Sequence, residues 1–261
     1  MNDVEKILNN YYNRYDEDAR LVKDKAHSVE FLTTIRYIDK YLKKGNRILE
    51  LGAGTGRYSL HYAKKGYKVD AIELVNKNLE ILKDGITPDM DITAKQGNAL
   101  NLHMYKDNTF DLTLVLGPLY HLYDDKDILK AIKEAIRVTK KNGKIFLAYI
   151  TNEAIFLSYG ILKGNIKNLK NISDKNWNIS NLKEEIFSCF KVEEFNKLIK
   201  KFNIRKLETI SVDGLATVLA EYINKFNEEE FNLYLDYHFK NCNRQDLIGF
   251  GRHNLEIVEK I

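Results

Sequence analysis

The 261-residue sequence is poor in the residues that build disulfide frameworks, metal motifs and flexible linkers. Its two cysteines, Cys189 and Cys242, lie far apart and follow no metal-ligand spacing. Only two prolines occur, and we find neither a low-complexity linker nor an internal repeat. These absences favour one domain with helical additions, working in a reducing compartment such as the cytoplasm.

Long apolar runs and a strong excess of one charge are also missing. No segment approaches the roughly 18 apolar residues that a membrane-spanning helix needs, and residues 1–6 lack the apolar core of a signal peptide. Lys and Arg number 41 against 37 Asp and Glu, which gives a net charge of +4. That bias is far from the basic stripe of a strong phosphate binder. We therefore expect neither a membrane nor a nucleic-acid partner.

The most informative stretch is residues 47–56, RILELGAGTG, which predicts a buried strand that runs into a glycine turn. Glycines have no Cβ, so the backbone can turn sharply and a ligand can approach the main chain closely. A second strand is expected at residues 68–73 and ends on Glu73. An acid about 20 residues beyond the first glycine can bind the hydroxyls of a ribose. The combination predicts a site for a nucleoside cofactor.

Two residues distinguish this turn from the dinucleotide-binding pattern Gly-x-Gly-x-x-Gly/Ala. Arg57 occupies the position of the last small residue, which leaves room for a pyrophosphate, and the third glycine comes one position early. Glu50 lies two residues before the first glycine, where it would repel a pyrophosphate but accept a hydrogen bond from an ammonium group. At this point the chain resembles the class I S-adenosylmethionine-dependent methyltransferases, whose first motif is Glu/Asp-x-Gly-x-Gly-x-Gly.

The resemblance covers residues 30–150 and implies S-adenosylmethionine as the cofactor. Glu50 would hold its amino group, and Glu73 would bind both ribose hydroxyls. Asn98 stands where this class usually has an aspartate that bonds the adenine amino group, and its carbonyl oxygen can accept the same bond at lower strength. The remaining implied contacts are backbone or apolar ones, from Gly52, Ala53, Gly54 and Gly56 to the methionine and ribose, from Ala99 to the adenine, and from Leu116 and Gly117 to the sulfonium.

Residues 117–122, GPLYHL, resemble the fourth motif of a broad bacterial branch of these enzymes. His121 stands where a general base belongs, and a base is needed only when the acceptor atom carries a proton at neutral pH. The alternative for His121 is a structural hydrogen bond to a backbone carbonyl. Tyr120 would shape the methyl channel. We name His121 and Tyr120 as the candidate catalytic residues.

The alternation of strands and helices predicts an α/β fold with a doubly wound, mostly parallel, seven-stranded, Rossmann-like sheet. N-terminal helices and helical cap insertions would complete it. We expect residues 1–45 to form an N-terminal helical cap segment and residues 46–261 the methyltransferase domain. That domain would carry an insertion at 151–190, plausible as a lid, and a helical addition at 214–242. The last strand, 255–259, is expected to be antiparallel and at the edge of the sheet.

The first helix carries an aromatic stripe that ends near Tyr15. We expect Tyr11 to serve core packing, and Tyr15 and Arg20 to touch the ligand. A second helix would begin with Ser28 as its N-cap.

Together these features predict transfer of a methyl group to an O or N atom of a small-molecule acceptor. The alternatives are an RNA methyltransferase and a non-catalytic S-adenosylmethionine-binding regulatory protein. Residues 116–119 lack the Asp/Asn-Pro-Pro-Tyr/Phe motif with which base methylases grip a flipped base. No metal is expected, and the sequence does not specify the acceptor.

Overall fold

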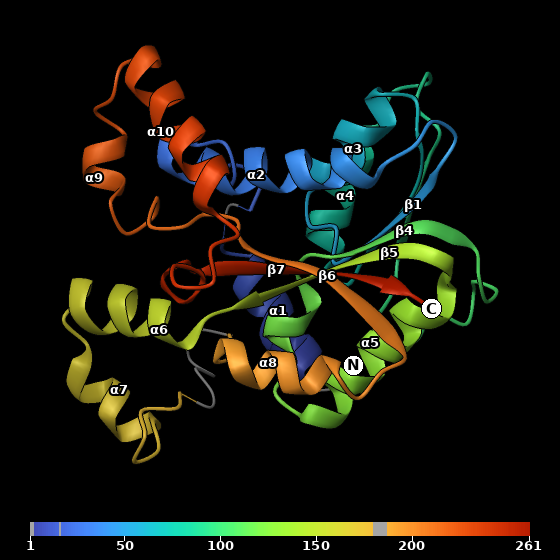
Figure 1. Ribbon diagram of the computed structural model, residues 1–261. Coiled ribbons are helices and arrows are strands. Elements are labelled where there is room, and N and C mark those ends of the chain that lie inside the picture. Colours follow the sequence, from blue (N-terminus) through green and yellow to red (C-terminus); the bar gives the residue numbers. More distant parts are fainter. Residues whose placement is uncertain (1–2, 16, 180–186) are drawn as a thin grey trace.

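The computed structural model describes residues 3–15, 17–179 and 187–261 (Figure 1). Its centre is a seven-stranded sheet in the order β3-β2-β1-β4-β5-β7-β6. The strands are β1 Arg47–Leu51, β2 Lys68–Glu73, β3 Ile92–Gln96, β4 Phe110–Val115, β5 Thr139–Ile150, β6 Ile204–Ser211 and β7 His253–Lys260. The expected Rossmann-like sheet is confirmed.

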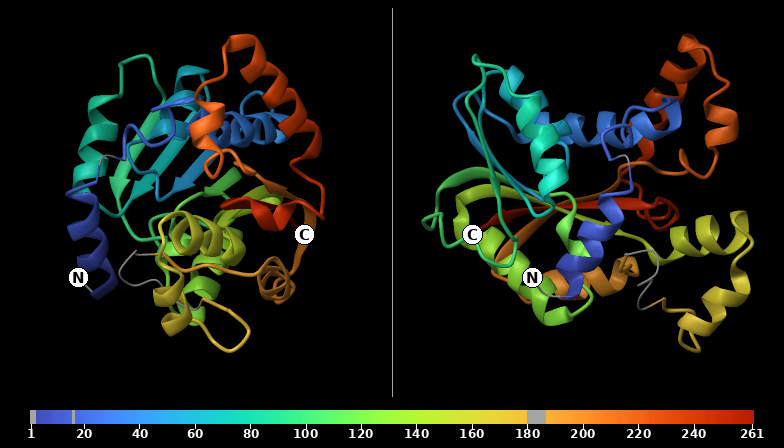
Figure 2. Two further views of the ribbon diagram at one scale, coloured as in Figure 1. Left: turned by 90° about the vertical axis from the view of Figure 1, so that its left-hand side faces the viewer. Right: turned by 180° about the vertical axis from the view of Figure 1, so that it is seen from behind.

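Helices follow most strands and cover both faces of the sheet (Figures 1 and 2). The α-helices are α1 Asp3–Tyr12, α2 Lys25–Tyr41, α3 Arg57–Lys64, α4 Asn76–Asp84, α5 Asp125–Val138, α6 Asn152–Ile155, α7 Ile166–Ile172, α8 Val192–Ile199, α9 Ala220–Ile223 and α10 Glu228–Asn241. Shorter or wider turns are η1 Pro118–His121, the π-helix η2 Phe156–Leu162 and η4 Ile248–Phe250.

The five strands from β3 to β5 are all parallel, so their carboxyl ends meet at one edge. The strand order reverses between β1 and β4, because the chain runs outward from β1 to β3 and then returns. Ligands of open α/β sheets bind outside the carboxyl ends at such a reversal. The glycine turn follows β1 and η1 follows β4, so both lie at this place.

Two apolar layers hold the helices to the sheet. On one face, α5 and α8 bury Ile132 and Phe195 against Leu49. On the other, α2 and α3 bury Ile38 and Tyr62 among side chains that include Leu114 and Phe146. Central strands buried on both faces read as almost continuous apolar runs, which is why β4 was recognisable from its sequence.

The expectation for the last strand is half right. β7 is antiparallel to both neighbours, but it lies between β5 and β6, and β6 forms the edge. All residues of β7 except Lys260 are buried, whereas Arg205 and Lys206 of β6 are exposed. Charged side chains on an exposed strand protect a sheet edge from further pairing.

The N-terminal segment differs from the expectation at two helix ends. α1 ends at Tyr12, so Tyr15 lies beyond it. α2 begins earlier than expected, because Asp24 rather than Ser28 is its N-cap and accepts a bond from the backbone N–H of His27. The predicted insertion lies partly outside the described residues, at 180–186.

Two helical projections extend from the same side of the molecule (Figures 1 and 2). One contains α9 and α10, and its Ile223 and Phe231 pack on the start of α2 through Ala26 and Val29. The other contains α6, η2 and α7. Within the described ranges, no helix is both long and apolar enough to cross a membrane.

Candidate functional site

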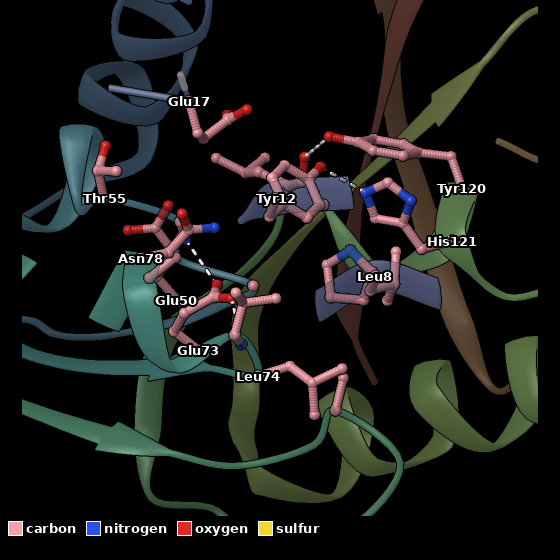
Figure 3. A pocket seen from close by; sticks show the side chains of 18 of the residues that line it. Leu8, Tyr12, Glu17, Glu50, Thr55, Glu73, Leu74, Asn78, Tyr120 and His121 are labelled. Atoms are coloured by element: carbon pink, nitrogen blue, oxygen red, sulfur yellow. Dashed lines mark hydrogen bonds between the residues drawn. The ribbon is translucent and has the colours of Figure 1, made fainter. Parts of the chain in front are cut away.

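A pocket opens at the carboxyl edge of the parallel strands, with about 1140 Å³ of empty space when its open mouth is included. The strand order places the predicted residues in a row, from Asn98 after β3 through Glu73 of β2 and the β1 turn to His121 after β4. Every predicted site residue except Tyr15 and Gly56 lines the pocket. Figure 3 shows Glu50 and Glu73 on one side of it and Tyr12, Tyr120 and His121 on the other.

The glycine turn keeps its backbone open to this pocket. Gly52 has a positive φ of 68°, and a Cβ there would lie 2.8 Å from the Pro118 ring. Gly56 also has a positive φ, of 87°, but a Cβ there would strike Leu82 at 2.6 Å. Gly56 therefore serves the packing of α4 against the turn, which is the role of a small residue at the helix–strand contact.

Glu50, the residue before the last in β1, is a buried acid, 1% exposed, and accepts a hydrogen bond from the Ser59 hydroxyl. Burial is the main cause that raises the pKa of its carboxyl to about 8, and nearby Glu73 adds to it. The carboxyl is thus protonated at neutral pH. The charged form of this acid is unfavourable without a cationic partner, because a buried carboxylate loses its solvation.

Glu73 ends β2 and is held by the backbone. The N–H of Gly54 donates to one carboxyl oxygen at 2.7 Å and the N–H of Val75 to the other at 2.8 Å. Burial raises the pKa of Glu73 to about 6, against the opposing effect of these two bonds. Each oxygen keeps a second lone pair, so the carboxyl group can also accept from two ribose hydroxyls.

Asn98 has both ends of its amide engaged. Its Oδ1 accepts from the N–H of Leu100 at 2.9 Å, and its Nδ2 donates to the Glu5 carboxyl at 3.0 Å. Glu5 belongs to α1 and lines the pocket together with Asn98 and Ala99. Sequence reasoning missed Glu5, because this contact joins positions 93 residues apart.

His121 is buried in η1 and forms a hydrogen bond between its Nε2 and the Tyr12 hydroxyl at 2.9 Å. Its ring stacks on Phe187, with centroids 5.4 Å apart. Burial is the main cause that holds the pKa of Tyr12 well above its usual range, so this phenol stays protonated. The neighbouring Tyr120 donates its hydroxyl to the Leu116 carbonyl at 2.8 Å, which fixes its ring beside the pocket.

The segment after α1 is tied down across the pocket. Lys77 of α4 donates to three backbone carbonyls at 3.1–3.3 Å, that of Tyr12 at the end of α1 and those of Asn13 and Tyr15 just beyond it. Arg57 donates to the backbone carbonyl of Asp18 at 2.8 Å. Tyr15 contributes its carbonyl to this arrangement, and its ring stacks on Tyr11 outside the pocket lining.

Arg20 lines the pocket and belongs to a buried ionic network. Its guanidinium donates to Glu17 and to Glu30, each at 2.9 Å. Glu30 lies 3.3 Å from His253 Nδ1, which is hydrogen-bonded to Asp213 at 2.9 Å. Glu30, Asp213 and His253 are close enough to share a metal ion, but the Arg20 guanidinium already supplies a cation to this carboxyl group.

The charge of the pocket suits a cation. Its lining includes six carboxyl groups, those of Glu5, Glu17, Asp18, Glu50, Glu73 and Asp127, and two guanidinium groups, those of Arg20 and Arg57. Both arginines are hydrogen-bonded to acids of the same segment. A ligand with an ammonium and a sulfonium group fits this balance better than one with a pyrophosphate.

Comparisons with known proteins agree with this geometry. Residues 48–143 match the family model described as "Methyltransferase domain". The demethylmenaquinone methyltransferase of Paenarthrobacter aurescens is 34% identical over 116 residues, which are 44% of this chain and 42% of that protein. The norajmaline N-methyltransferase of Rauvolfia serpentina is 32% identical over 151 residues, 56% of this chain and 50% of that protein.

The fold also matches solved structures along its whole length. The geranyl diphosphate C-methyltransferase of Streptomyces coelicolor A3(2) aligns with a TM-score of 0.65 and 10% identity, covering 100% of this chain and 99% of that one. The chain spans about half the length of the curated relatives named here. The segment that carries the glycine turn, residues 48–143, thus matches the model of a methyltransferase domain, and the solved structures share its fold.

Proposed function

We propose that the whole chain is an S-adenosylmethionine-dependent methyltransferase that modifies an O or N atom of a small-molecule acceptor. One observation carries the proposal. Two buried carboxyl groups, Glu50 and Glu73, flank an open glycine backbone on one side of a pocket whose other side holds His121. This arrangement offers acceptors for an ammonium group and a ribose, and a base at the far side.

Each residue then has one task. Glu50 would bind the cofactor's ammonium group, and Glu73 its ribose hydroxyls. The backbone near Leu116 and Gly117 would face the sulfonium. The cofactor supplies the methyl group when bound, and the chain's contribution is chiefly alignment of the acceptor with it.

His121 Nε2 would take the proton of the acceptor. In the transfer, the acceptor's lone pair would form the bond to the methyl carbon, and the electron pair of the broken carbon–sulfur bond would stay on sulfur. The acceptor's proton passes to His121. The Tyr12 hydroxyl, 2.9 Å from Nε2, marks the direction from which an O–H or N–H group can reach this nitrogen.

The size and composition of the pocket support a small acceptor. Leu8, Tyr12 and Leu122 line it near His121, so an acceptor with an apolar or aromatic body fits there. The acidic lining disfavours a polyanion such as RNA. A relative that methylates nitrogen and a structural neighbour that methylates carbon are both similar to this chain, so the assignment of an O or N atom rests on His121.

The test combines cofactor binding with acceptor screening. In calorimetric titrations, S-adenosylhomocysteine should bind with micromolar affinity and NAD should not bind measurably. Methyl transfer from labelled S-adenosylmethionine is then measured with phenols, amines and carboxylic acids. NAD binding without binding of S-adenosylhomocysteine contradicts the proposal.

His121→Ala should lower turnover about 10²- to 10⁴-fold with little change in cofactor affinity. Tyr12→Phe is the matched control, since it removes the partner hydroxyl and keeps the base. Lost cofactor binding in His121→Ala, with no separate effect on turnover, makes His121 a structural residue. Cofactor binding without transfer to any acceptor favours a regulatory protein, and submicromolar tRNA binding at physiological salt favours an RNA methyltransferase.

A further inference from the structure

We propose that Glu5 of α1, rather than Asn98, reads the adenine amino group of the cofactor. The inference rests on the proposed function, because it assigns the adenine end of the same pocket. Asn98 would act as a positioning residue that holds the Glu5 carboxyl in place. The adenine would thus be recognised by an N-terminal helix instead of by the sheet.

The orientation of the Asn98 amide is the first observation that supports this proposal. Adenine presents its exocyclic amino group as a donor, so the protein must offer an acceptor. Asn98 Oδ1 already accepts from the N–H of Leu100 at 2.9 Å, and the amide NH₂ of Asn98 points to Glu5. Its remaining acceptor capacity is a single lone pair of a neutral oxygen.

Glu5 supplies the stronger acceptor. Its Oε1 lies 3.0 Å from Asn98 Nδ2, and the side chain lines the pocket beside Gly97, Ala99 and Leu100. A carboxyl group has about four lone-pair sites, so it can accept from several donors at once, Asn98 and the adenine amino group among them. Hydrogen bonds to a charged acceptor are about twice as strong as neutral ones. The acid is therefore the better partner for the adenine amino group.

The placement of Glu5 also links adenine recognition to the docking of α1 on the pocket. α1 contributes Leu8 and Tyr12 to the same pocket, and the carbonyls at its end are held by Lys77. A cofactor whose adenine bonds Glu5 therefore favours the docked position of α1, since a ligand stabilises the state that it binds better. The same helix brings the Tyr12 hydroxyl to His121.

The test exchanges the acid and the amide between the two positions. Binding of S-adenosylhomocysteine is measured by calorimetry for Glu5→Gln, Asn98→Asp and the double variant, with Glu80→Gln on the exposed face of α4 as the matched control. Glu5→Gln should bind about 10- to 100-fold more weakly, because it replaces a charged acceptor. Asn98→Asp should also weaken binding, because it places two acids in contact. The double variant should recover only part of the affinity, since it removes the contact between two acids but keeps a neutral amide at position 5.

A second ligand tests recognition of the adenine ring directly. S-inosylhomocysteine carries a 6-oxo group in place of the amino group, so its oxygen would face the Glu5 carboxyl. The wild-type protein should prefer S-adenosylhomocysteine about 100-fold, and Glu5→Gln should reduce this preference to a few-fold, because an amide can turn its NH₂ group to the oxygen. Circular dichroism verifies that each variant keeps its helix content.

The outcomes separate this inference from the proposed function. Absence of S-adenosylhomocysteine binding in the wild-type protein overturns both. Normal wild-type binding with an unchanged affinity in Glu5→Gln, or tighter binding in Asn98→Asp, overturns the role of Glu5 alone. Full recovery of the wild-type affinity in the double variant also contradicts it, because an acid at position 98 would then serve the adenine as well as Glu5 does.

Discussion

Glu50 sets the pH behaviour of cofactor binding. Its pKa of about 8 in the free protein means that the carboxyl carries a proton at pH 6.5. A bound ammonium group favours the carboxylate, so binding lowers this pKa and releases the proton. We expect S-adenosylhomocysteine to release about one proton per site at pH 6.5, where its own amino group is already protonated. Calorimetric titrations in buffers of different ionisation enthalpy measure this number.

Glu50→Gln is the control for the proton release. It keeps the shape of the side chain and its bond from Ser59, and it removes the titrating group. Buffer-independent binding enthalpies in the wild-type protein would show that Glu50 does not meet the ammonium group. The same release in Glu50→Gln would assign the proton to another residue.

Glu73→Ala tests the ribose contact. Loss of hydrogen bonds to a charged group should weaken binding of S-adenosylhomocysteine by roughly 1.5–3 kcal/mol. The substitution also leaves the backbone N–H groups of Gly54 and Val75 without the carboxyl group to which they donate in the wild-type protein. Glu73→Gln should therefore lose less, since its amide oxygen still accepts one of these bonds. An unchanged affinity in Glu73→Ala would remove Glu73 from the cofactor site.

At the level of single residues, the sequence predicts those site residues that the strands of the sheet position. Glu50 and Glu73 lie at the carboxyl ends of the neighbouring parallel strands β1 and β2, and this pairing brings them together. Glu5 and Tyr12 reach the pocket from α1, whose docking depends on contacts far along the chain. The stripe of tyrosines indicated a helix but not its last residue, so Tyr15 was preferred to Tyr12. Asn78, a buried polar residue of α4, was available as a signal and was overlooked.

Among the elements, α1 and residues 17–20 form the cover of the pocket. Lys77 holds the end of α1 through three carbonyl groups, where the helix dipole also favours a cation. Lys77→Ala should loosen this cover and speed dissociation of S-adenosylhomocysteine about 5- to 30-fold, as expected for a loss of about 1–2 kcal/mol. Stopped-flow displacement measures the rate. Lys83→Ala, at the exposed other end of α4, should leave it unchanged.

Proteolysis gives an independent measurement of the same cover. Chymotrypsin cleaves after tyrosine, and Tyr11, Tyr12 and Tyr15 follow one another at the end of α1. S-adenosylhomocysteine should slow these cuts in the wild-type protein, since it favours the docked state, and the protection should shrink in Lys77→Ala. Ligand-insensitive cleavage would mean that α1 does not close on the cofactor.

The elements themselves were predicted where a local pattern suffices. The β1 turn and α3 follow from one motif, and β4 from one apolar run. The position of β7 in the sheet could not be predicted from the sequence of β7 alone. Only a comparison of its apolar residues with the charged residues of β6 indicates which of the two strands lies at the edge. The charged Arg205 and Lys206 were the available signal for an edge strand. The insertion at 151–190 was expected as a lid, yet none of its described residues lines the pocket, and this role stays a prediction.

For the molecule as a whole, Glu50 and Glu73 should make the stability of the free protein depend on pH. Both folded-state pKa values, about 8 and about 6, are raised above the usual 4.5. The stabilising contribution is therefore fully present below pH 4.5 and is lost as pH rises through 6 and 8. We expect the free energy of unfolding to fall by roughly 5 kcal/mol between pH 5 and pH 8.5.

Urea unfolding at the two pH values measures this fall. Glu50→Gln should retain only the smaller part due to Glu73, and saturating S-adenosylhomocysteine should reduce the fall in the wild-type protein. A free energy of unfolding that rises over this interval would contradict the assignment of the two raised pKa values.

The position of β7 bears on how the chain folds during synthesis. β6 pairs with β7 alone among the described strands, and β7 comes after α9 and α10 in the sequence. A ribosome therefore makes the edge strand well before the strand that joins it to the sheet. Until then β5 also exposes the backbone groups that will face β7. Nascent chains stalled before residue 253 should present two open strand edges, which makes them substrates for chaperones and prone to association with one another.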